Sequence, residues 1–290
     1  MIFLKLLRIN HWVKNLFLFI PVFFAGELFV SGHYIKLILG FISYSFIASA
    51  VYIFNDYNDI EVDRKHPEKQ ERPLASGAVS GKQGIIIMIL LLFLGFGIAW
   101  ILNIRFLLIV LAYFILNIAY SLGLKHISIL DIFIVAFGFL LRVMGGGIIV
   151  AVSVSEWLVI MVFLLAVFLG LAKRRDDILR FNASGKILRK ASQHYNLDFT
   201  NACLTMLSAI ICVAYLMYTI SDEVIQKFQS HYVYWTSIFV LAGIMRYLQI
   251  TLVENNSASP TKVLYTDRFL IITLVGWIVM FYMIIYLHKL

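Results

Sequence analysis

Charged residues are scarce in this chain: they make up 14% of its 290 residues, whereas 62% are hydrophobic. A soluble globular domain holds about 45–50% apolar and about 25% charged residues, so this composition excludes an ordinary soluble domain. Linkers and low-complexity runs are also missing, and no small-residue cleavage site follows the first apolar run, as it would in a signal peptide. We therefore expect a single membrane-embedded domain over residues 1–290.

Cysteine is nearly absent as well. The two that occur, Cys203 and Cys212, lie on one predicted helix, too far apart along its axis to bond to each other. Neither belongs to a spacing that is typical of a metal or redox site. The sequence therefore predicts neither a disulfide nor a cysteine-based metal centre.

Long apolar runs are what the chain has in abundance. A helix that crosses the membrane needs about 20 consecutive, mostly apolar residues. Nine segments approach this length: 13–31, 36–54, 84–101, 106–122, 131–152, 157–172, 200–220, 232–252 and 269–288. We therefore predict an all-α integral membrane protein with nine transmembrane helices, of which the sixth is short and the first carries three polar residues.

The basic residues lie mostly on one side of these predicted spans. The net charge of +8 would suit a nucleic-acid partner, but most of the 24 Lys and Arg residues fall before the first span or after spans two, four, six and eight. Only Lys36, Arg105, Lys227 and Lys289 fall on the opposite side. Because cytoplasmic loops carry the excess of Lys and Arg, we predict a cytoplasmic amino terminus, a multi-pass protein of the cell membrane and no nucleic-acid partner.

Two long loops are predicted on the cytoplasmic side, over residues 55–83 and 173–199. Four spans separate them, which suggests two related bundles that face each other. The second loop opens with Lys173-Arg174-Arg175-Asp176-Asp177. The two aspartates there have an alternative interpretation as members of a salt-bridged helix face.

The first loop opens with an unusual acidic run between Asn55 and Asp63. If the helix of the second span continues, Asp56, Asp59 and Asp63 lie on one of its faces. Three carboxylates repel each other unless a cation joins them, and Mg²⁺ prefers oxygen ligands and shares them with substrate phosphates. Basic residues that could hold further phosphate charge follow at once: Arg64, Lys65, Lys69 and Arg72. The run therefore predicts a magnesium-diphosphate site, with a solvated helix end as the alternative.

Two arginines fall inside predicted spans. Arg142 lies deep in the fifth span, where a charge is costly and commonly lines a cavity or a functional path. Asp131 is about 16 Å away along the same helix, too far for an ion pair. Arg246 is open to a second interpretation, in which its side chain extends to the membrane surface. The glycines at 145–147 indicate close helix packing or a helix break.

The acidic motif also carries a family resemblance. Asn55-Asp56-x-x-Asp59-x-x-x-Asp63, followed by Arg72-Pro73-Leu74, resembles the first signature of the UbiA superfamily of intramembrane prenyltransferases. The resemblance covers nearly the whole chain and implies a UbiA-like helical bundle. It also implies that Mg²⁺ and a diphosphate bind between the two cytoplasmic loops.

The second signature of that superfamily is altered here. Asp-x-x-x-Asp is usual after the sixth span, but the corresponding pair is Lys173 and Asp177. The segments at 11–15, 63–67, 170–175 and 265–268 resemble the polyprenyl-phosphate phosphoribosyltransferases, of the decaprenyl-phosphate type. This branch moves 5-phosphoribosyl from phosphoribosyl diphosphate to a polyprenyl phosphate and releases diphosphate.

Charge arithmetic favours the same branch. Phosphoribosyl diphosphate brings a 5-phosphate beyond its diphosphate, and the lipid acceptor brings another phosphate, so more cations are needed. Lys173 changes the site in that direction. The expected metal-binding and catalytic residues are Asp56, Asp59 and Asp63, with Mg²⁺ as cofactor. The expected substrate contacts are Lys14, Asn55, Arg64, Lys69, Arg72, Tyr120, Arg142, Lys173, Arg174, Asp177 and Arg189.

Two other functions stay open at this point. One is transfer of a prenyl chain from a prenyl diphosphate to an aromatic or lipid acceptor, where some of the 24 Phe and 15 Tyr residues could shield a carbocation. The other is a transporter or channel, which only the intramembrane arginines suggest. The sequence also leaves open whether the protein forms a homo-oligomer.

Overall fold

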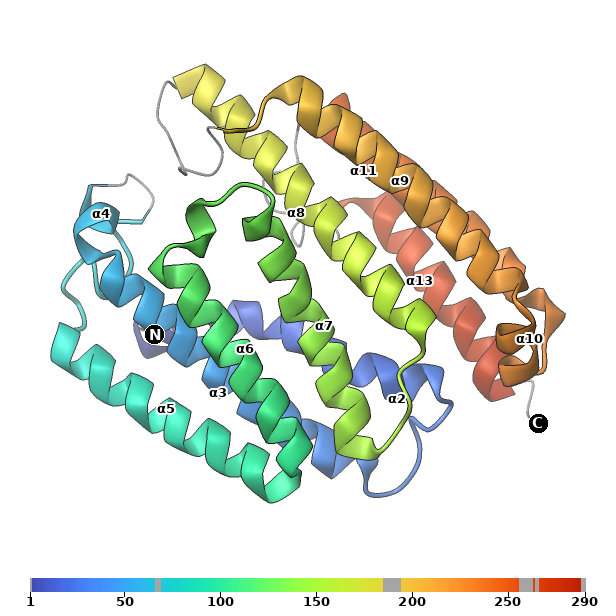
Figure 1. The fold of residues 1–290 in the computed structure, drawn as a ribbon, viewed down its shortest axis with the longest axis horizontal. Helices are drawn as coiled ribbons and strands as arrows, with labels where there is room; N and C mark the ends of the chain where they lie inside the picture. Colours follow the sequence, from blue (N-terminus) through green and yellow to red (C-terminus); the bar gives the residue numbers. More distant parts are fainter. Residues whose placement is uncertain (1, 66–68, 185–193, 256–262, 264–265, 288–290) are drawn as a thin grey trace. The chain divides into compact units, whose positions relative to one another are not determined.

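All regular structure in the described part of the chain is helical (Figure 1). The computed structural model describes residues 2–65, 69–184, 194–255, 263 and 266–287. Eight helices within these ranges are long and apolar enough to cross a membrane. They are α3 (His33–Asn58), α5 (Gly81–Leu102), α6 (Ile104–Leu122), α7 (Leu130–Val150), α8 (Glu156–Ser184), α9 (Leu197–Ile220), η4 with α11 (His231–Leu252), and α13 with η5 (Arg268–Leu287). The all-α prediction is confirmed, whereas the count of nine spans is not.

The first predicted span, 13–31, consists of short helices instead. After α1 (Ile2–Leu7), the 3₁₀ helix η1 (Ile9–Phe19) leads into α2 (Ile20–Phe24). The backbone of η1 packs directly on α7, because a Cβ added to Gly146 would lie 1.9 Å from the carbonyl oxygen of Leu18. The glycine run at 145–147 therefore serves close packing and does not break α7.

The prediction of a second loop over residues 173–199 is partly wrong. Helix α8 continues through its first residues to Ser184, and ion pairs on the helix surface accompany this continuation. Arg174 pairs with Asp177 three residues on, and Asp176 pairs with Arg180 four residues on. In the first loop, α4 (Ile60–Arg64) follows α3, and α5 begins at a capping box formed by Ser80 and Gln83.

The chain packs as two compact units, which we describe separately. The amino-terminal unit contains residues 1–124 and 137–154, and the carboxyl-terminal unit contains residues 125–136 and 155–290. In the first unit α3 packs along α5, where Gly95 leaves room for Ile47. In the second unit α8 packs on α9, and α11 on α13. Cys203 and Cys212 are both free thiols, as predicted.

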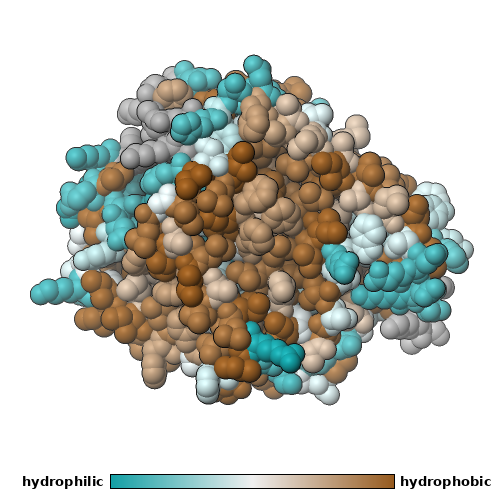
Figure 2. Space-filling view, viewed as in Figure 1, coloured by the Kyte–Doolittle hydropathy of each residue, from teal (hydrophilic) through white to brown (hydrophobic). Residues whose placement is uncertain are grey.

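Large apolar side chains remain on the outside of both units. Phe93 and Trp100 on α5 are 76% and 66% exposed, and Ile272 on α13 is 68% exposed. The face seen in Figure 2 is mostly hydrophobic, and hydrophilic side chains gather toward its edges. Exposed apolar surface of this extent suits a protein whose solvent is lipid.

Candidate active site

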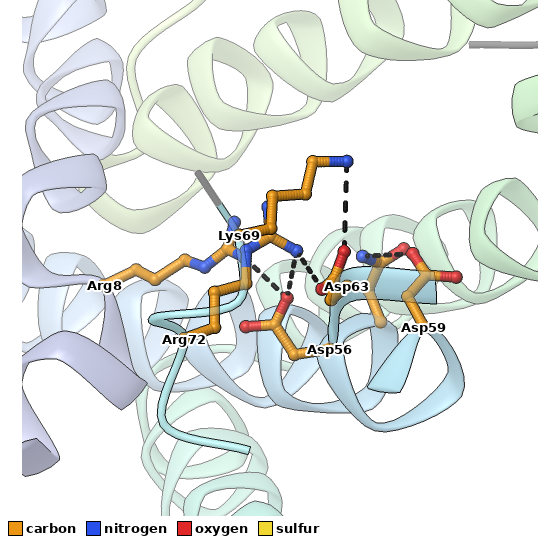
Figure 3. A network of polar contacts seen from close by, with 7 residues as sticks. Arg8, Asp56, Asp59, Asp63, Lys69 and Arg72 are labelled. Carbon is orange, nitrogen blue, oxygen red and sulfur yellow. Dashed lines mark hydrogen bonds and ion pairs between the residues drawn. The ribbon is translucent and has the colours of Figure 1, made fainter. Parts of the chain in front are cut away.

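Two buried carboxylates and three cations form a cluster in the amino-terminal unit (Figure 3). Asp56 from α3 and Asp63 from α4 are 3% and 1% exposed. Arg72 Nη1 donates to both of them, over 2.9 Å to Asp56 Oδ1 and 2.6 Å to Asp63 Oδ2. Arg8 Nη2 donates to the same Asp56 oxygen over 2.6 Å, and Lys69 Nζ lies 3.9 Å from Asp63 Oδ1. We call Asp56 and Asp63 the carboxylate pair.

The local backbone explains why this pair forms. Helix α3 ends at Asn58, but the hydrogen bonds from Asp59 N to Asn55 O and from Asp63 N to Asp59 O keep the four-residue spacing of a helix into α4. Asp56 and Asp63 therefore stay on one face, as predicted. Asp59, at the junction, differs: its carboxylate accepts from Asn55 Nδ2 over 3.1 Å and lies apart from the pair (Figure 3).

The carboxylate pair fits a hard divalent cation. Both carboxylates already converge on one positive centre, the Arg72 nitrogen, and all their donor atoms are oxygens, the ligands that Mg²⁺ prefers. Asp59 follows Asp56 within one helical turn. In the arrangement seen here, however, no three side chains of His, Cys, Asp or Glu within the described ranges come together as a ligand set.

Arg8 is a site residue that the sequence did not reveal. Its backbone is left-handed, with φ 49° and ψ 48°, at the corner between α1 and η1. This corner directs the guanidinium to Asp56, and its Cζ lies 4.9 Å from the centre of the Tyr52 ring. Arg8 precedes Asp56 by 48 positions, so no local pattern connects the two, and in the sequence Arg8 counted only as a topology signal.

Arg142 lies at the centre of a second polar cluster in the same unit. The side chain is 5% exposed and donates from Nε to Asn15 Oδ1 over 2.8 Å. Its other bonds go to the Gly138 carbonyl, over 2.6 Å, and to the Tyr113 hydroxyl, over 3.1 Å. The Tyr44 and Tyr113 rings lie 4.9 and 4.7 Å from the guanidinium carbon. Asn15 is fixed in turn by a bond from its amide nitrogen to Ser45 Oγ.

The other predicted contacts of this unit lie elsewhere. Arg64 is exposed and pairs with Glu61 over 2.9 Å, while its Nε donates to the Ala75 carbonyl. Tyr120 is half-buried in the last turn of α6. Lys14, on η1, is half-buried and lies within electrostatic range of Arg142 and Arg8. The structure thus gathers Lys69 and Arg72 at the carboxylate pair, and Lys14 directly precedes Asn15, which binds Arg142.

In the carboxyl-terminal unit, Arg174 joins two carboxylates. Its Nε donates to Asp131 over 2.7 Å and its Nη1 to Asp177 over 2.6 Å. Asp131 is fully buried and also accepts from the Tyr195 hydroxyl over 3.3 Å. Desolvation raises the pKa of Tyr195 to about 12, so its hydroxyl keeps the proton that it donates. Asp131 and Tyr195 were not expected as site residues.

The remaining cations of this unit differ in their surroundings. Lys173 is exposed on α8. Arg175 is buried and bonds to Asn201, to the Thr251 carbonyl and to Asn255, so it holds α8 against α9 and the end of α11. Arg189, a predicted substrate contact, lies outside the described residues.

Arg246 has acidic partners. Its Nη2 lies 2.7 Å from Asp267, and its Nη1 lies 2.7 Å from Glu254. Hydrogen bonding from Arg246 holds the pKa of Asp267 below its ordinary value. These ion pairs give Arg246 a structural role and remove one of the two observations that suggested a transport path.

The family model, the curated relatives and the solved structures all indicate similarity to UbiA-type membrane transferases. The sequence model of the UbiA prenyltransferase family matches residues 16–272. The decaprenyl-phosphate phosphoribosyltransferase of Corynebacterium glutamicum is 26% identical over 98% of this chain and 86% of its own length. That of Mycolicibacterium smegmatis is also 26% identical, over 95% of this chain and 89% of its own length. The fold is similar to that of a UbiA homologue from Archaeoglobus fulgidus bound to GPP and Mg²⁺, with a TM-score of 0.72, 22% identity and coverage of 98% and 99% of the two chains.

Proposed function

Because this chain belongs to the UbiA prenyltransferase family, we propose that it is a Mg²⁺-dependent phosphoribosyltransferase of the cell membrane. It transfers 5-phosphoribosyl from phosphoribosyl diphosphate to a polyprenyl phosphate and releases diphosphate on the cytoplasmic side. The similarity to two decaprenyl-phosphate phosphoribosyltransferases along nearly the whole chain supports this branch. The observation that carries the proposal is the excess of cations over acids: Arg8, Lys69 and Arg72 at the carboxylate pair, and Lys14 with Arg142 nearby in the same unit.

The carboxylate pair is the proposed metal and diphosphate site. Asp56 and Asp63 would hold Mg²⁺, with Asp59 within reach by a change of its side-chain rotamer. The Mg²⁺ bound to the archaeal homologue supports this choice of metal. When bound, the metal neutralises charge that develops on the leaving diphosphate. Arg72, Arg8 and Lys69 then exchange their carboxylate partners for diphosphate oxygens, which are equally good acceptors for charge-assisted hydrogen bonds.

The reaction needs no general base. The acceptor is already an anion, so one of its phosphate oxygens attacks the anomeric carbon as the bond from that carbon to the diphosphate breaks. The electron pair of the broken bond leaves with the diphosphate. The protein therefore contributes mainly by holding two polyanions in line and by stabilising negative charge where it increases.

For the second loop we propose a division of roles. Lys173 is exposed and stands where the family usually has an aspartate, so it contacts a substrate phosphate. Arg174, by contrast, already binds Asp131 and Asp177. It therefore orients Asp177.

Prenyl transfer is the competing function, and the archaeal homologue bound to GPP supports it. Both reactions use the same diphosphate site, so donor choice separates them. The test supplies the purified protein with Mg²⁺, a polyprenyl phosphate and either labelled phosphoribosyl diphosphate or labelled GPP. We expect label from the phosphoribosyl donor alone in the lipid product. Label from GPP alone would establish the competing function.

A further inference from the structure

Arg142 has more hydrogen-bond donors than its protein neighbours satisfy. A guanidinium carries five N–H groups, and Asn15, Gly138 and Tyr113 accept one bond each. The nearby rings stabilise the charge through their faces but supply no anionic acceptor. Within the described part of the chain, no carboxylate contacts this buried side chain. The remaining donors are therefore available to a ligand.

Lys14 adds a second positive charge next to this cluster. It directly precedes Asn15 on η1, and the side chain of Asn15 accepts from Arg142. No described residue forms a hydrogen bond or ion pair with the Lys14 ammonium group. Two cations in a poorly solvated interior repel each other strongly. An anion placed between them would remove this repulsion.

Tyr44 supplies a third, independent observation. It is fully buried, and its hydroxyl has no hydrogen-bond partner among the residues that the structure describes. Its ring lies 4.9 Å from the guanidinium carbon of Arg142. Buried polar groups are nearly always satisfied in native proteins, so an unsatisfied one indicates a missing partner. Each of the three residues Arg142, Lys14 and Tyr44 thus has a donor that a negatively charged oxygen would satisfy.

We propose that these three residues form a binding subsite for a phosphate monoester, separate from the carboxylate pair. This inference rests on the proposed function, which brings two monoesters to the protein: the 5-phosphate of the donor and the phosphate of the lipid acceptor. A monoester dianion offers three oxygens that can accept from a guanidinium, an ammonium and a hydroxyl together.

Helix α3 connects the subsite to the carboxylate pair. Tyr44, Tyr52 and Asp56 follow one another along it, and Tyr44 lies about 18 Å from Asp56 along the axis. Tyr52 lies between them under the Arg8 guanidinium, which binds Asp56. Polar groups therefore extend from the carboxylate pair into the apolar core of the amino-terminal unit. The subsite holds either the far end of the donor or the head of the acceptor, and binding experiments can separate these two sources.

The experiment measures binding to the full-length protein in detergent micelles by calorimetry. The probes are ribose 5-phosphate, farnesyl phosphate and, as a probe of the carboxylate pair, Mg²⁺ with diphosphate. Lys14→Met removes a cation, and Tyr44→Phe removes a hydroxyl, that form no hydrogen bond with any described residue. Lys82→Met, at the exposed start of α5, is the matched control. Thermal melting of each variant reports on folding.

We expect Lys14→Met to weaken binding of at least one monoester at least about tenfold, and Tyr44→Phe to weaken it about two- to tenfold. Diphosphate binding stays as in the wild type, and neither variant melts at a lower temperature, because Lys14→Met removes a repulsive charge and Tyr44→Phe removes a hydroxyl without a partner among the described residues. The monoester that is affected identifies the source, and loss of both supports a shared phosphate subsite. Unchanged binding of both monoesters in both variants would overturn the inference, as would an equal loss of diphosphate binding. These binding measurements do not depend on turnover, so the subsite and the proposed function can fail separately. If the variants confirm the subsite but the protein is inactive with phosphoribosyl diphosphate, the proposed function is refuted and the subsite is not.

Discussion

A single nitrogen of Arg72 holds Asp56 and Asp63 together, 2.9 Å from an oxygen of the first and 2.6 Å from an oxygen of the second. Without this nitrogen the two buried carboxylates would lose the donor that bridges them, and Asp56 would keep Arg8 while Asp63 would keep Lys69. The same position suits a divalent metal, because it lies between two sets of carboxylate oxygens. We therefore expect Arg72 and Mg²⁺ each to stabilise this pair, and thermal melting can measure both effects.

Arg72→Met should make the stability of the protein depend on Mg²⁺. Removing the guanidinium takes away the donor that bridges the two buried carboxylates and leaves only Arg8 with Asp56 and Lys69 with Asp63, at a cost of about 1–3 kcal/mol in the free energy of unfolding. Mg²⁺ then recovers part of this loss by binding the pair. Thermal melting with and without Mg²⁺ checks the prediction: the metal should raise the melting temperature of the variant more than that of the wild type. An equal effect of Mg²⁺ on both proteins would contradict a metal site at the pair.

Substitution of the carboxylates should abolish turnover without unfolding the protein. Asp56→Asn and Asp63→Asn keep the shape and one acceptor oxygen of each side chain but remove the charge that holds the metal, so we expect activity to fall at least about a hundredfold. Glu61→Gln is the control, because Glu61 is exposed and pairs only with Arg64 within the described structure. Initial rates at saturating Mg²⁺ are the measurement, and wild-type rates in both Asn variants would refute the role of the pair.

Lys173→Asp tests the charge argument for the second loop. The change restores the Asp-x-x-x-Asp pattern with Asp177 but places a negative charge where the donor needs a positive one. Loss of one charge-assisted hydrogen bond costs about 1.5–3 kcal/mol, so the Michaelis constant for phosphoribosyl diphosphate should rise at least about tenfold. Mg²⁺ dependence should remain. Lys82→Asp, an equal change of surface charge, serves as the control. An unchanged Michaelis constant in Lys173→Asp would show that Lys173 does not contact the donor and only contributes to the positive charge of the cytoplasmic side.

The Asp131–Arg174 pair should matter for stability more than any surface ion pair. Both side chains are buried, and Asp131→Ala removes a charge-assisted hydrogen bond and leaves Arg174 with Asp177 as its acidic partner, so the free energy of unfolding should fall by about 1.5–3 kcal/mol. Tyr195→Phe removes only one neutral donor from Asp131 and should cost about 0.5–1.5 kcal/mol. Reversible unfolding in mixed micelles gives both values. Equal losses in the two variants would show that the ion pair contributes no more than the hydroxyl.

Parts of this site could be predicted from the sequence because they depend on local geometry. Helical periodicity alone places Asp56 and Asp63 on one face. The continuation of α8 past Lys173 also had a local signal, since Arg174 with Asp177 and Asp176 with Arg180 have the spacing of ion pairs on a helix. The sequence left the salt-bridged helix face as an alternative, and the structure contains it.

Other parts depend on contacts between distant segments. Arg8 reaches Asp56 from a different helix, and the partners of Arg142 come from η1 and α6 as well as from its own helix. Sequence periodicity cannot predict these contacts between distant residues, because they depend on how whole helices pack against each other. Asp59 shows the limit even of local reasoning: it lies one helical turn from both Asn55 and Asp56, and periodicity does not decide that its carboxylate bonds to Asn55.

Release of diphosphate from phosphoribosyl diphosphate, measured with and without a polyprenyl phosphate, tests the central claim most directly. The purified protein is reconstituted in liposomes with Mg²⁺, and the Asp56→Asn variant is measured in parallel. We predict release only when both substrates and Mg²⁺ are present, and none from the variant. Release that does not depend on the lipid phosphate, or its absence with both substrates present, would contradict the assignment.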